Sequence, residues 1–186
     1  MSSAPSSGPR SSTDTKARIL RVAQEVFSSR GYAQAGLRNI AAKAGVAPSL
    51  VIKYFGTKAK LFEEALVAAI IPIRQFQQDR ATLGETIVAS IVDPDAHMFA
   101  PAMIALALGD GEARQIAEQV VKDQIVAPMA DWLDGEDAGA RALNILAMTT
   151  GFWIYHRNMS SLLDAKEMKR SAALLTQTLQ DLGQPG

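Results

Sequence analysis

One stretch, residues 37–58, restricts the possible fold of this chain more than any other. It runs LRNIAAKAGVAPSLVIKYFGTK, and its apolar residues recur at helical spacing on both sides of Gly45. Gly45 ends a first short helix, and Pro48 suits the first turn of a second, where a missing N–H costs nothing. Val51 and Phe55 lie one helical turn apart and return to the same core. Two short helices joined by so tight a turn indicate a helix-turn-helix, whose second helix enters the major groove of DNA.

Helical patterns also account for the rest of the chain, and no segment alternates as a strand would. A first helix is predicted from about Thr13 or Asp14 to Ser29, where Gly31 ends it, and the helix after Thr57 should end or kink at Pro72. The predicted helices, in order, cover about residues 13–29, 37–44, 47–55, 57–71, 83–92, 95–108, 112–133 (with a kink or break at Pro128), 137–157 and 166–182.

The fold class is therefore all-α, with three parts. Residues 1–12 are rich in Ser, Pro and Gly and are expected to be a disordered tail. Residues 13–56 form the helix-turn-helix head, and residues 57–186 form a larger helical body. A body of this size can bury its own hydrophobic core.

Charge divides along the chain, although the formal net charge is zero. Residues 1–60 carry ten Lys/Arg against two Asp/Glu, a net of +8, whereas residues 61–186 carry nine against seventeen, a net of −8. A basic amino-terminal third joined to an acidic remainder favours a module that binds a polyanion such as DNA. Chance separation of surface charges between two helical regions is the alternative.

Composition also disfavours several other kinds of site. The chain has no cysteine, which excludes disulfides and thiolate metal sites, and its two histidines, His97 and His156, lie far apart. We therefore expect no metal and no cofactor. No apolar run approaches the ~18–20 residues of a membrane span, and no signal peptide is evident. A cytoplasmic protein without membrane contact is expected.

Several residues of the helix-turn-helix stretch resemble the DNA-binding head of the tetracycline-repressor (TetR) family of transcriptional regulators. The resemblance covers about residues 15–62, and the chain length and acidic helical body also suit that family. It implies a homodimeric repressor that leaves a palindromic operator on double-stranded DNA when a small molecule binds in the body. The motifs that carry it, at fixed spacing, are Arg38-Asn39-Ile40-Ala41, Ala44-Gly45-Val46, Tyr54-Phe55, and Lys58 with Leu61.

The resemblance also implies which head residues meet DNA. A guanidinium at position 38 suits a phosphate or a guanine edge, and Lys53 suits guanine or phosphate. Lys58 lies at a helix N-terminus, which itself favours an anion, so phosphate is its expected partner. The full expected set is Arg38, Pro48, Ser49, Ile52, Lys53, Tyr54 and Lys58.

The chain departs from the family pattern at several of these positions. The family commonly has tyrosine where this chain has Ile52, glycine or another small residue at Ser49, and histidine at Tyr54. A threonine common two positions before Arg38 is replaced by Gly36. These differences leave the base sequence that the second helix recognises undetermined.

In the body, the resemblance implies a dimer interface on the final two helices and a ligand pocket. Interface residues would form the apolar stripes of a four-helix bundle, and the pocket would be mostly apolar with adaptable methionines. Either set could instead be ordinary core. The expected interface residues are Leu143, Leu146, Ala147, Thr150, Ile154, Leu174, Leu175 and Leu182. The expected pocket residues are Phe62, Leu66, Phe76, Met98, Phe99, Met103, Met129, Trp132, Phe152 and Trp153, with His97, Asn144, Thr149 and His156 as polar candidates.

Two other functions compete with the regulator. An architectural or nonspecific DNA-binding protein would share the basic head but bind all sequences alike, without a ligand. A helical-bundle enzyme is disfavoured, because the chain has no Glu-x-x-His pair and no Gly-rich phosphate loop. The acidic cluster around Gly135 indicates a solvated loop that caps helices, rather than a catalytic site.

Overall fold

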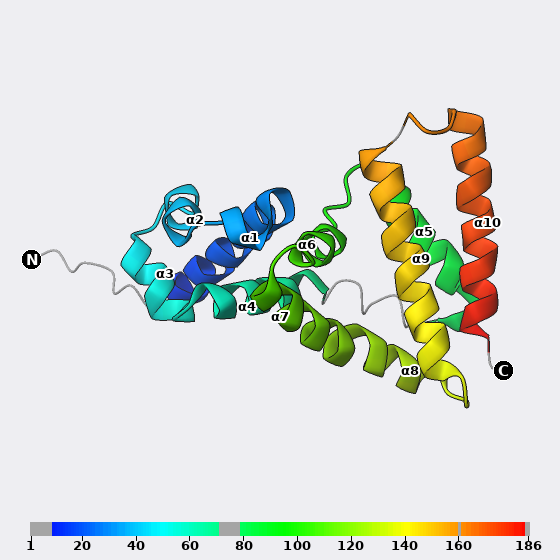
Figure 1. Ribbon diagram of the computed structural model, residues 1–186, viewed down its shortest axis with the longest axis horizontal. Coiled ribbons are helices and arrows are strands. Elements are labelled where there is room, and N and C mark those ends of the chain that lie inside the picture. Colours follow the sequence, from blue (N-terminus) through cyan, green and yellow to red (C-terminus); the bar gives the residue numbers. More distant parts are fainter. Residues whose placement is uncertain (1–8, 71–78, 160, 185–186) are drawn as a thin grey trace, which may run out of the picture.

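The computed structural model describes residues 9–70, 79–159 and 161–184, which are almost entirely helical and contain no strand. Figure 1 shows the amino-terminal head at one end and helices α5, α9 and α10 together at the other, with α6 to α8 between them. The head consists of α1 (Pro9–Gln34), α2 (Leu37–Lys43) and α3 (Pro48–Phe55). We group α4 (Lys58–Ile70) with the head because it packs along α1, although the sequence placed residues 57–70 in the body. The body consists of a 3₁₀ turn (Arg80–Thr82), α5 (Leu83–Val92), α6 (Ala100–Ala107), α7 (Gly111–Val121), a π-helical segment (Lys122–Val126), α8 (Ala127–Leu133), α9 (Ala138–Asn158) and α10 (Ala165–Gly183). The all-α prediction is confirmed.

Helix α1 is longer than the sequence pattern predicted. It begins at Pro9, a residue type that fits the first turn of a helix, so residues 9–12 are helical and not part of a disordered tail. Residues 1–8 lie outside the described residues. At the other end Gly31 interrupts the helix as expected: its φ of 72° and ψ of 170° are not helical, and a short second helical stretch then continues to Gln34.

Helix α6 begins at Ala100, five residues later than the predicted start at Asp95. The preceding residues form a turn, in which a carboxylate oxygen of Asp93 accepts a hydrogen bond from the Asp95 N–H at 2.9 Å. Such short-range side-chain bonds compete with helical ones. Pro101 then lies in the first turn of α6.

The predicted helix over residues 112–133 is observed as α7, the π-helical segment and α8 in succession. The chain remains helical through Pro128, so the break expected there as an alternative to a kink does not occur, but the helix is irregular directly before this residue. The Ala127 N–H bonds to the Lys122 carbonyl, five residues back, so the wider π turn precedes Pro128. Pro128 itself lies in the first turn of α8, where its missing N–H is tolerated.

Two glycines let α5 and α10 approach unusually closely. A Cβ at Gly84 would lie 2.1 Å from the Thr176 carbonyl oxygen, well inside contact distance. A Cβ at Gly183 would lie 2.6 Å from a Leu83 methyl. Backbone therefore packs on backbone, and α10 is held tightly to α5 of its own chain. None of the described helices combines the length and hydropathy of a membrane span.

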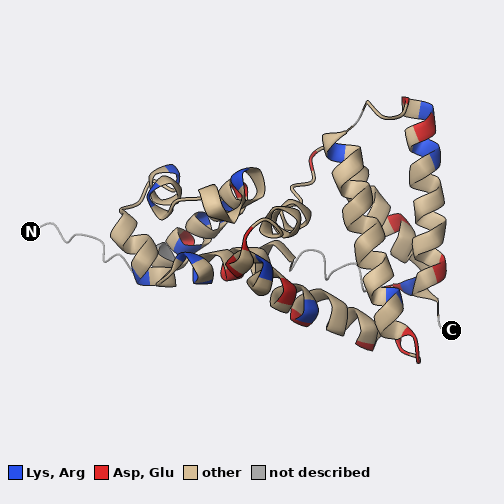
Figure 2. Ribbon diagram, in the orientation of Figure 1, with Lys and Arg blue, Asp and Glu red and all other residues tan. Residues whose placement is uncertain are grey.

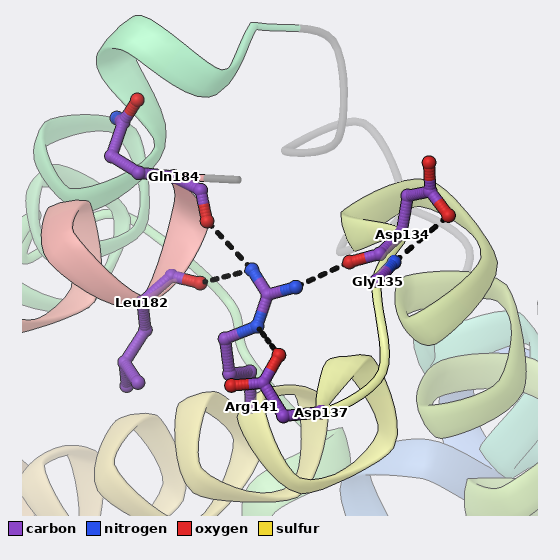
Figure 3. A network of polar contacts seen from close by, with 6 residues as sticks. All are labelled: Asp134, Gly135, Asp137, Arg141, Leu182 and Gln184. Atoms are coloured by element: carbon purple, nitrogen blue, oxygen red, sulfur yellow. Dashed lines mark hydrogen bonds and ion pairs between the residues drawn. The ribbon is translucent and has the colours of Figure 1, made fainter. Parts of the chain in front are cut away.

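A buried guanidinium links the loop between α8 and α9 to the carboxyl-terminal end of α10 (Figure 3). Arg141 of α9 is only 6% exposed, and its Nε donates to the Asp137 carboxylate at 2.7 Å. One terminal nitrogen donates to the carbonyls of Leu182 (3.3 Å) and Gln184 (2.7 Å), and the other donates to the Asp134 carbonyl. The acidic loop predicted between α8 and α9 is thus fastened to the end of α10.

Candidate functional site

The turn between α2 and α3 determines how the head presents its second helix. The Gly45 N–H bonds to the Ala42 carbonyl at 3.1 Å, and the Val46 N–H bonds to the Ala41 carbonyl at 3.0 Å. These two bonds form a Schellman motif, which requires a left-handed residue just past the helix. Gly45 supplies it with a φ of 64°.

We expect Gly45→Ala to lower the free energy of unfolding by about 1 kcal/mol, because only backbone strain opposes it. A Cβ at Gly45 would meet nothing within 4 Å, so no clash contributes. Thermal unfolding followed by circular dichroism measures the change. Gly139→Ala, in the first turn of α9 and equally open, is the control and should not destabilise the protein. Equal stability of the two variants would contradict a strained turn.

Five of the seven expected DNA-contact residues are exposed on α2 and α3. On α3 the inward residues Val51 and Phe55 are 1% and 4% exposed, whereas Ile52 on the outward side is 54% exposed. Arg38 lies exposed in the first turn of α2, which packs against α3. The exposed set is Arg38, Pro48, Ser49, Ile52 and Lys53. The head thus presents a helix face with apolar, hydroxyl and cationic groups, the chemistry that reads base edges.

The other two expected contacts, Tyr54 and Lys58, are half-buried and have partners within the head. The Tyr54 hydroxyl lies 3.0 Å from the Ser12 hydroxyl of α1. Lys58 places its Nζ over the Tyr32 ring, 4.3 Å from the centroid, and donates to the Ala33 carbonyl at 3.3 Å. An ammonium has three N–H donors, so Lys58 retains donors for a phosphate.

The structure shows which cations of the head are already neutralised. Lys16 of α1 pairs with Glu64 of α4 at 2.8 Å. Lys60 pairs with Glu63 at 3.0 Å within α4. Arg38, Lys43 and Lys53 make no ion pair with any described residue. Figure 2 shows Lys and Arg spread over the head, with Asp and Glu concentrated in the body. The described head cations that form no ion pair therefore include Arg38, Lys43 and Lys53 on α2 and α3, and also Arg18 and Arg30 on α1 and Lys58 on α4.

A tyrosine joins the head to the body. The Tyr32 ring packs against Phe27 and Phe62, with centroids 6.1 and 5.3 Å away, and its hydroxyl donates to the Glu112 carboxylate of α7 at 2.5 Å. Burial, the hydrogen bond to Glu112 and the nearby charges of Glu112 and Asp110 together raise the pKa of Tyr32 above its ordinary value. Sequence reasoning missed this pair, because no local pattern links residues 80 positions apart.

The body contains an enclosed apolar cavity of about 40 Å³ between α5, α6, α8 and α9. Of the expected pocket residues, Met98 and Met129 line it, and so does the polar candidate Thr149. Leu146 and Thr150, expected at the dimer interface, also line it. The remaining lining residues are Ile87, Ala100, Pro101, Ile104, Ile125 and Ile145. Sequence reasoning missed these because aliphatic side chains at helical spacing look the same whether they face a cavity or solid core.

The other expected pocket residues lie elsewhere. Phe62, Leu66 and Met103 are at most 1% exposed and belong to the solid core. Phe99 and Trp153 line a shallow outer hollow together with Met98. Phe76 lies outside the described residues. Trp132 packs against the Arg80 guanidinium and Phe152 stacks on His156, while His97 lines the outer hollow and Asn144 is exposed.

The expected dimer residues on α9 and α10 divide into two groups. Leu143 and Leu174 are 57% and 71% exposed, Ala147 is exposed, and Ile154 is half-buried. Leu146, Leu175 and Leu182 pack against the core of the same chain. The outer side of these two helices therefore carries large apolar side chains in contact with solvent.

Two family models match the chain over most of its length. The model described as "Bacterial regulatory proteins, tetR family" matches residues 19–65, which include the whole helix-turn-helix. The model described as "Tetracyclin repressor-like, C-terminal domain" matches residues 81–182, more than half of the chain. The chain belongs to the tetR family. It is a DNA-binding transcriptional regulator, and its family is one of regulatory proteins, not of enzymes.

Solved structures of tetR-family regulators share this fold at low sequence identity. A putative TetR-family regulator from Rhodococcus sp. is 15% identical, with a TM-score of 0.73 over 91% of this chain and 98% of that one. NalD of Pseudomonas aeruginosa, described as the secondary repressor of the MexAB-OprM multidrug efflux pump, is 20% identical, with a TM-score of 0.63 over 90% and 95%. A putative regulator from Saccharomonospora viridis, solved in complex with choline, is 16% identical, with a TM-score of 0.61 over 91% and 95%. None of the curated proteins matches the chain.

Proposed function

We propose that this tetR-family regulator is a homodimeric repressor that a small molecule, bound in the body cavity, releases from a palindromic operator. The observation that carries the proposal is the position of α6, which packs along α1 of the head and also lines the cavity. NalD is a repressor of this fold, and the Saccharomonospora viridis regulator was solved with a small molecule bound. Both are consistent with the proposal.

Helix α6 supplies a short physical path between cavity and head. Ala100, Pro101 and Ile104 line the cavity, while Leu106 lies against Gly31 at the kink of α1. A molecule that needs more room than the cavity offers would displace α6 and with it α1. No described residue of α4 lines the cavity, so α4 does not supply this path. The ligand acts only through its different affinities for the two arrangements, which typically amount to 1–3 kcal/mol of coupling.

The proposed dimer is supported by α9, which carries apolar side chains on two opposite sides of the helix. Its inner side lines the cavity through Ile145 and Leu146, whereas Leu143 and Ala147 lie on the outer side and are exposed. A helix that is apolar all round is normally buried all round. Pairing α9 and α10 with the same helices of a second copy would bury this side and give two recognition helices a fixed spacing.

Lys53→Ala tests the DNA-binding part of the proposal. We expect it to reduce discrimination between operator and random DNA by about 1–3 kcal/mol, because a base contact is lost. Fluorescence anisotropy with an operator selected from random sequences measures both affinities at several salt concentrations. The control is Lys169→Ala, which removes the same charge from an exposed position on α10, far from the head. It should change neither the affinity for the operator nor the affinity for random DNA.

Other results would separate the alternatives. An equal loss on operator and random DNA would assign Lys53 to a phosphate. If no selected sequence binds more tightly than random DNA at physiological salt, the protein is a nonspecific DNA binder and the specific-repressor proposal is wrong.

Ile104→Phe tests the path through α6. The larger side chain fills the cavity from the α6 side, so we expect operator affinity to fall roughly 5–150-fold while the mass of the dimer stays the same. The control is Ile91→Phe on α5, a fully buried residue that does not line the cavity. It should lower the melting temperature but keep operator affinity. If both variants bind the operator as the parent does, α6 does not link cavity and head.

A further inference from the structure

Polar side chains replace apolar ones halfway along the inner side of α9. Ala142 and Ile145 are buried on that side, at 0% and 1% exposed. Thr149, Trp153 and His156 follow at intervals of four and three residues, which keeps them on one side of the helix. The carboxyl-terminal half of α9 therefore directs three hydrogen-bonding groups into the body.

These three groups are buried and have no protein partner. Thr149 Oγ1, Trp153 Nε1 and His156 Nδ1 make no hydrogen bond to any described residue, and no other side chain of the described residues has a buried polar atom in this condition. Elsewhere in the chain buried polar groups are satisfied, as where Gln24 donates to the Ala65 carbonyl at 3.1 Å. Native proteins seldom leave such atoms unpaired, because each one costs free energy. Three on one side of one helix indicate a site that hydrogen-bonds something other than this chain.

The three side chains Thr149, Trp153 and His156 extend along α9 from the apolar cavity toward the surface. Thr149 lines the cavity, Trp153 lines the outer hollow, and Met98 lines both. Met98 belongs to the turn before α6, and Arg157 of α9 holds that turn by donating to its backbone carbonyls. The bonds reach Asp93 at 3.0 Å, Pro94 at 3.3 Å and Ala96 at 2.6 Å. Met98, an adaptable side chain, therefore lies at the boundary that the cavity and the hollow share.

We propose that this site binds a small aliphatic molecule with one oxygen acceptor, such as a carbonyl, whose chain occupies the cavity and whose oxygen meets Thr149 and Trp153. The proposal rests on the proposed function, because it names the ligand class of the same cavity. An indole N–H only donates, and a threonine hydroxyl donates readily, so an acceptor completes both. No acidic side chain lines the cavity or the hollow, which disfavours a cation. About 40 Å³ gives room for a few carbon atoms, since a single water needs ~10–15 Å³ on the same scale.

Tryptophan fluorescence provides a direct test without DNA. The chain has two tryptophans, so Trp132→Phe leaves Trp153 as the sole reporter. Propyl methyl ketone and pentane, which differ in the carbonyl but have equal chain length, are the probes, because a propyl group matches the room in the cavity. We expect the ketone to shift the Trp153 emission saturably and to bind roughly tenfold more tightly than pentane.

A matched pair of variants localises the hydrogen bond. In the Trp132→Phe background, Thr149→Val should weaken ketone binding several-fold and leave pentane binding unchanged. Thr150→Val is the control: it removes a hydroxyl that also lines the cavity but is not among the three unpaired groups. It should change the binding of neither probe. Equal effects of the two variants, equal affinity for the two probes, or no binding of either probe would overturn the proposal.

These experiments distinguish a wrong ligand class from a wrong release mechanism. If the ketone binds as expected but operator affinity is the same with and without it, the ligand class stands and ligand-driven release is wrong. If Ile104→Phe weakens operator binding but the ketone binds no better than pentane, release stands and the ligand class is wrong.

Discussion

Replacing Leu143 and Leu174 together with glutamate is expected to convert the dimer to monomers and to weaken operator binding by roughly 10²–10⁴-fold. The two leucines are 57% and 71% exposed on the outer side of α9 and α10, so the change leaves the fold of a single chain intact. In the proposed dimer, however, it places four carboxylates in an apolar interface, where an unpaired charge is costly. A monomer engages one half-site and loses the gain from linking two heads.

Leu108→Glu is the matched control, because Leu108 is 68% exposed but lies at the end of α6, away from α9 and α10. Light scattering coupled to size-exclusion chromatography gives the mass of each variant, and anisotropy gives the operator affinity. A double variant that remains dimeric would show that the pair forms through another surface. A monomeric variant with unchanged operator affinity would show that the DNA site is not palindromic.

Arg141→Met is expected to lower the free energy of unfolding by about 2–4 kcal/mol. The guanidinium donates to Asp137 and to three backbone carbonyls, so its loss leaves several acceptors without a partner. Part of the loss is recovered by water, because the Asp137 side chain is 63% exposed. For a chain of this length the melting temperature should fall by about 5–15 °C.

Arg170→Met on α10 is the control, since this arginine is exposed and should change stability by less than about 0.5 kcal/mol. Urea unfolding followed by circular dichroism gives both free energies. Arg141→Lys adds a second comparison: it keeps the charge but not the fork that reaches carbonyls of two segments. If Lys restores full stability, the charge and not the geometry of the bonds holds the loop to α10.

The head could be predicted from sequence because its determinants are local. Gly45, the Val51/Phe55 pair and the Thr57 cap act within a few residues, and the Lys60 N–H does bond to the Thr57 hydroxyl at 3.1 Å. Helix α5 was likewise predicted with the observed bounds, Leu83–Val92, because strong turn signals flank it. Local rules therefore sufficed wherever a helix boundary depended on near neighbours.

The start of α6 and the cavity lining could not be predicted in the same way. The turn before α6 is held by Arg157, more than 60 residues later, so a local helical pattern extended too far. The cavity is lined by aliphatic side chains, two methionines and two threonines, whereas the sequence drew attention to aromatic residues such as Phe62, which fill the core of the head. Which apolar side chains face a void depends on how the helices pack, and one sequence does not specify that arrangement.

The close approach of α5 and α10 has a mechanical consequence for the cavity. Ile87 forms the α5 wall, one turn after Gly84, whose backbone already touches the backbone of α10. That wall cannot move closer to α10, because two backbones in contact cannot be compressed further. In the proposed release mechanism, we therefore expect a molecule that enlarges the cavity to displace α6 toward the head rather than α5 toward α10. The absence of a side chain at position 84 would thereby bias the direction of the response.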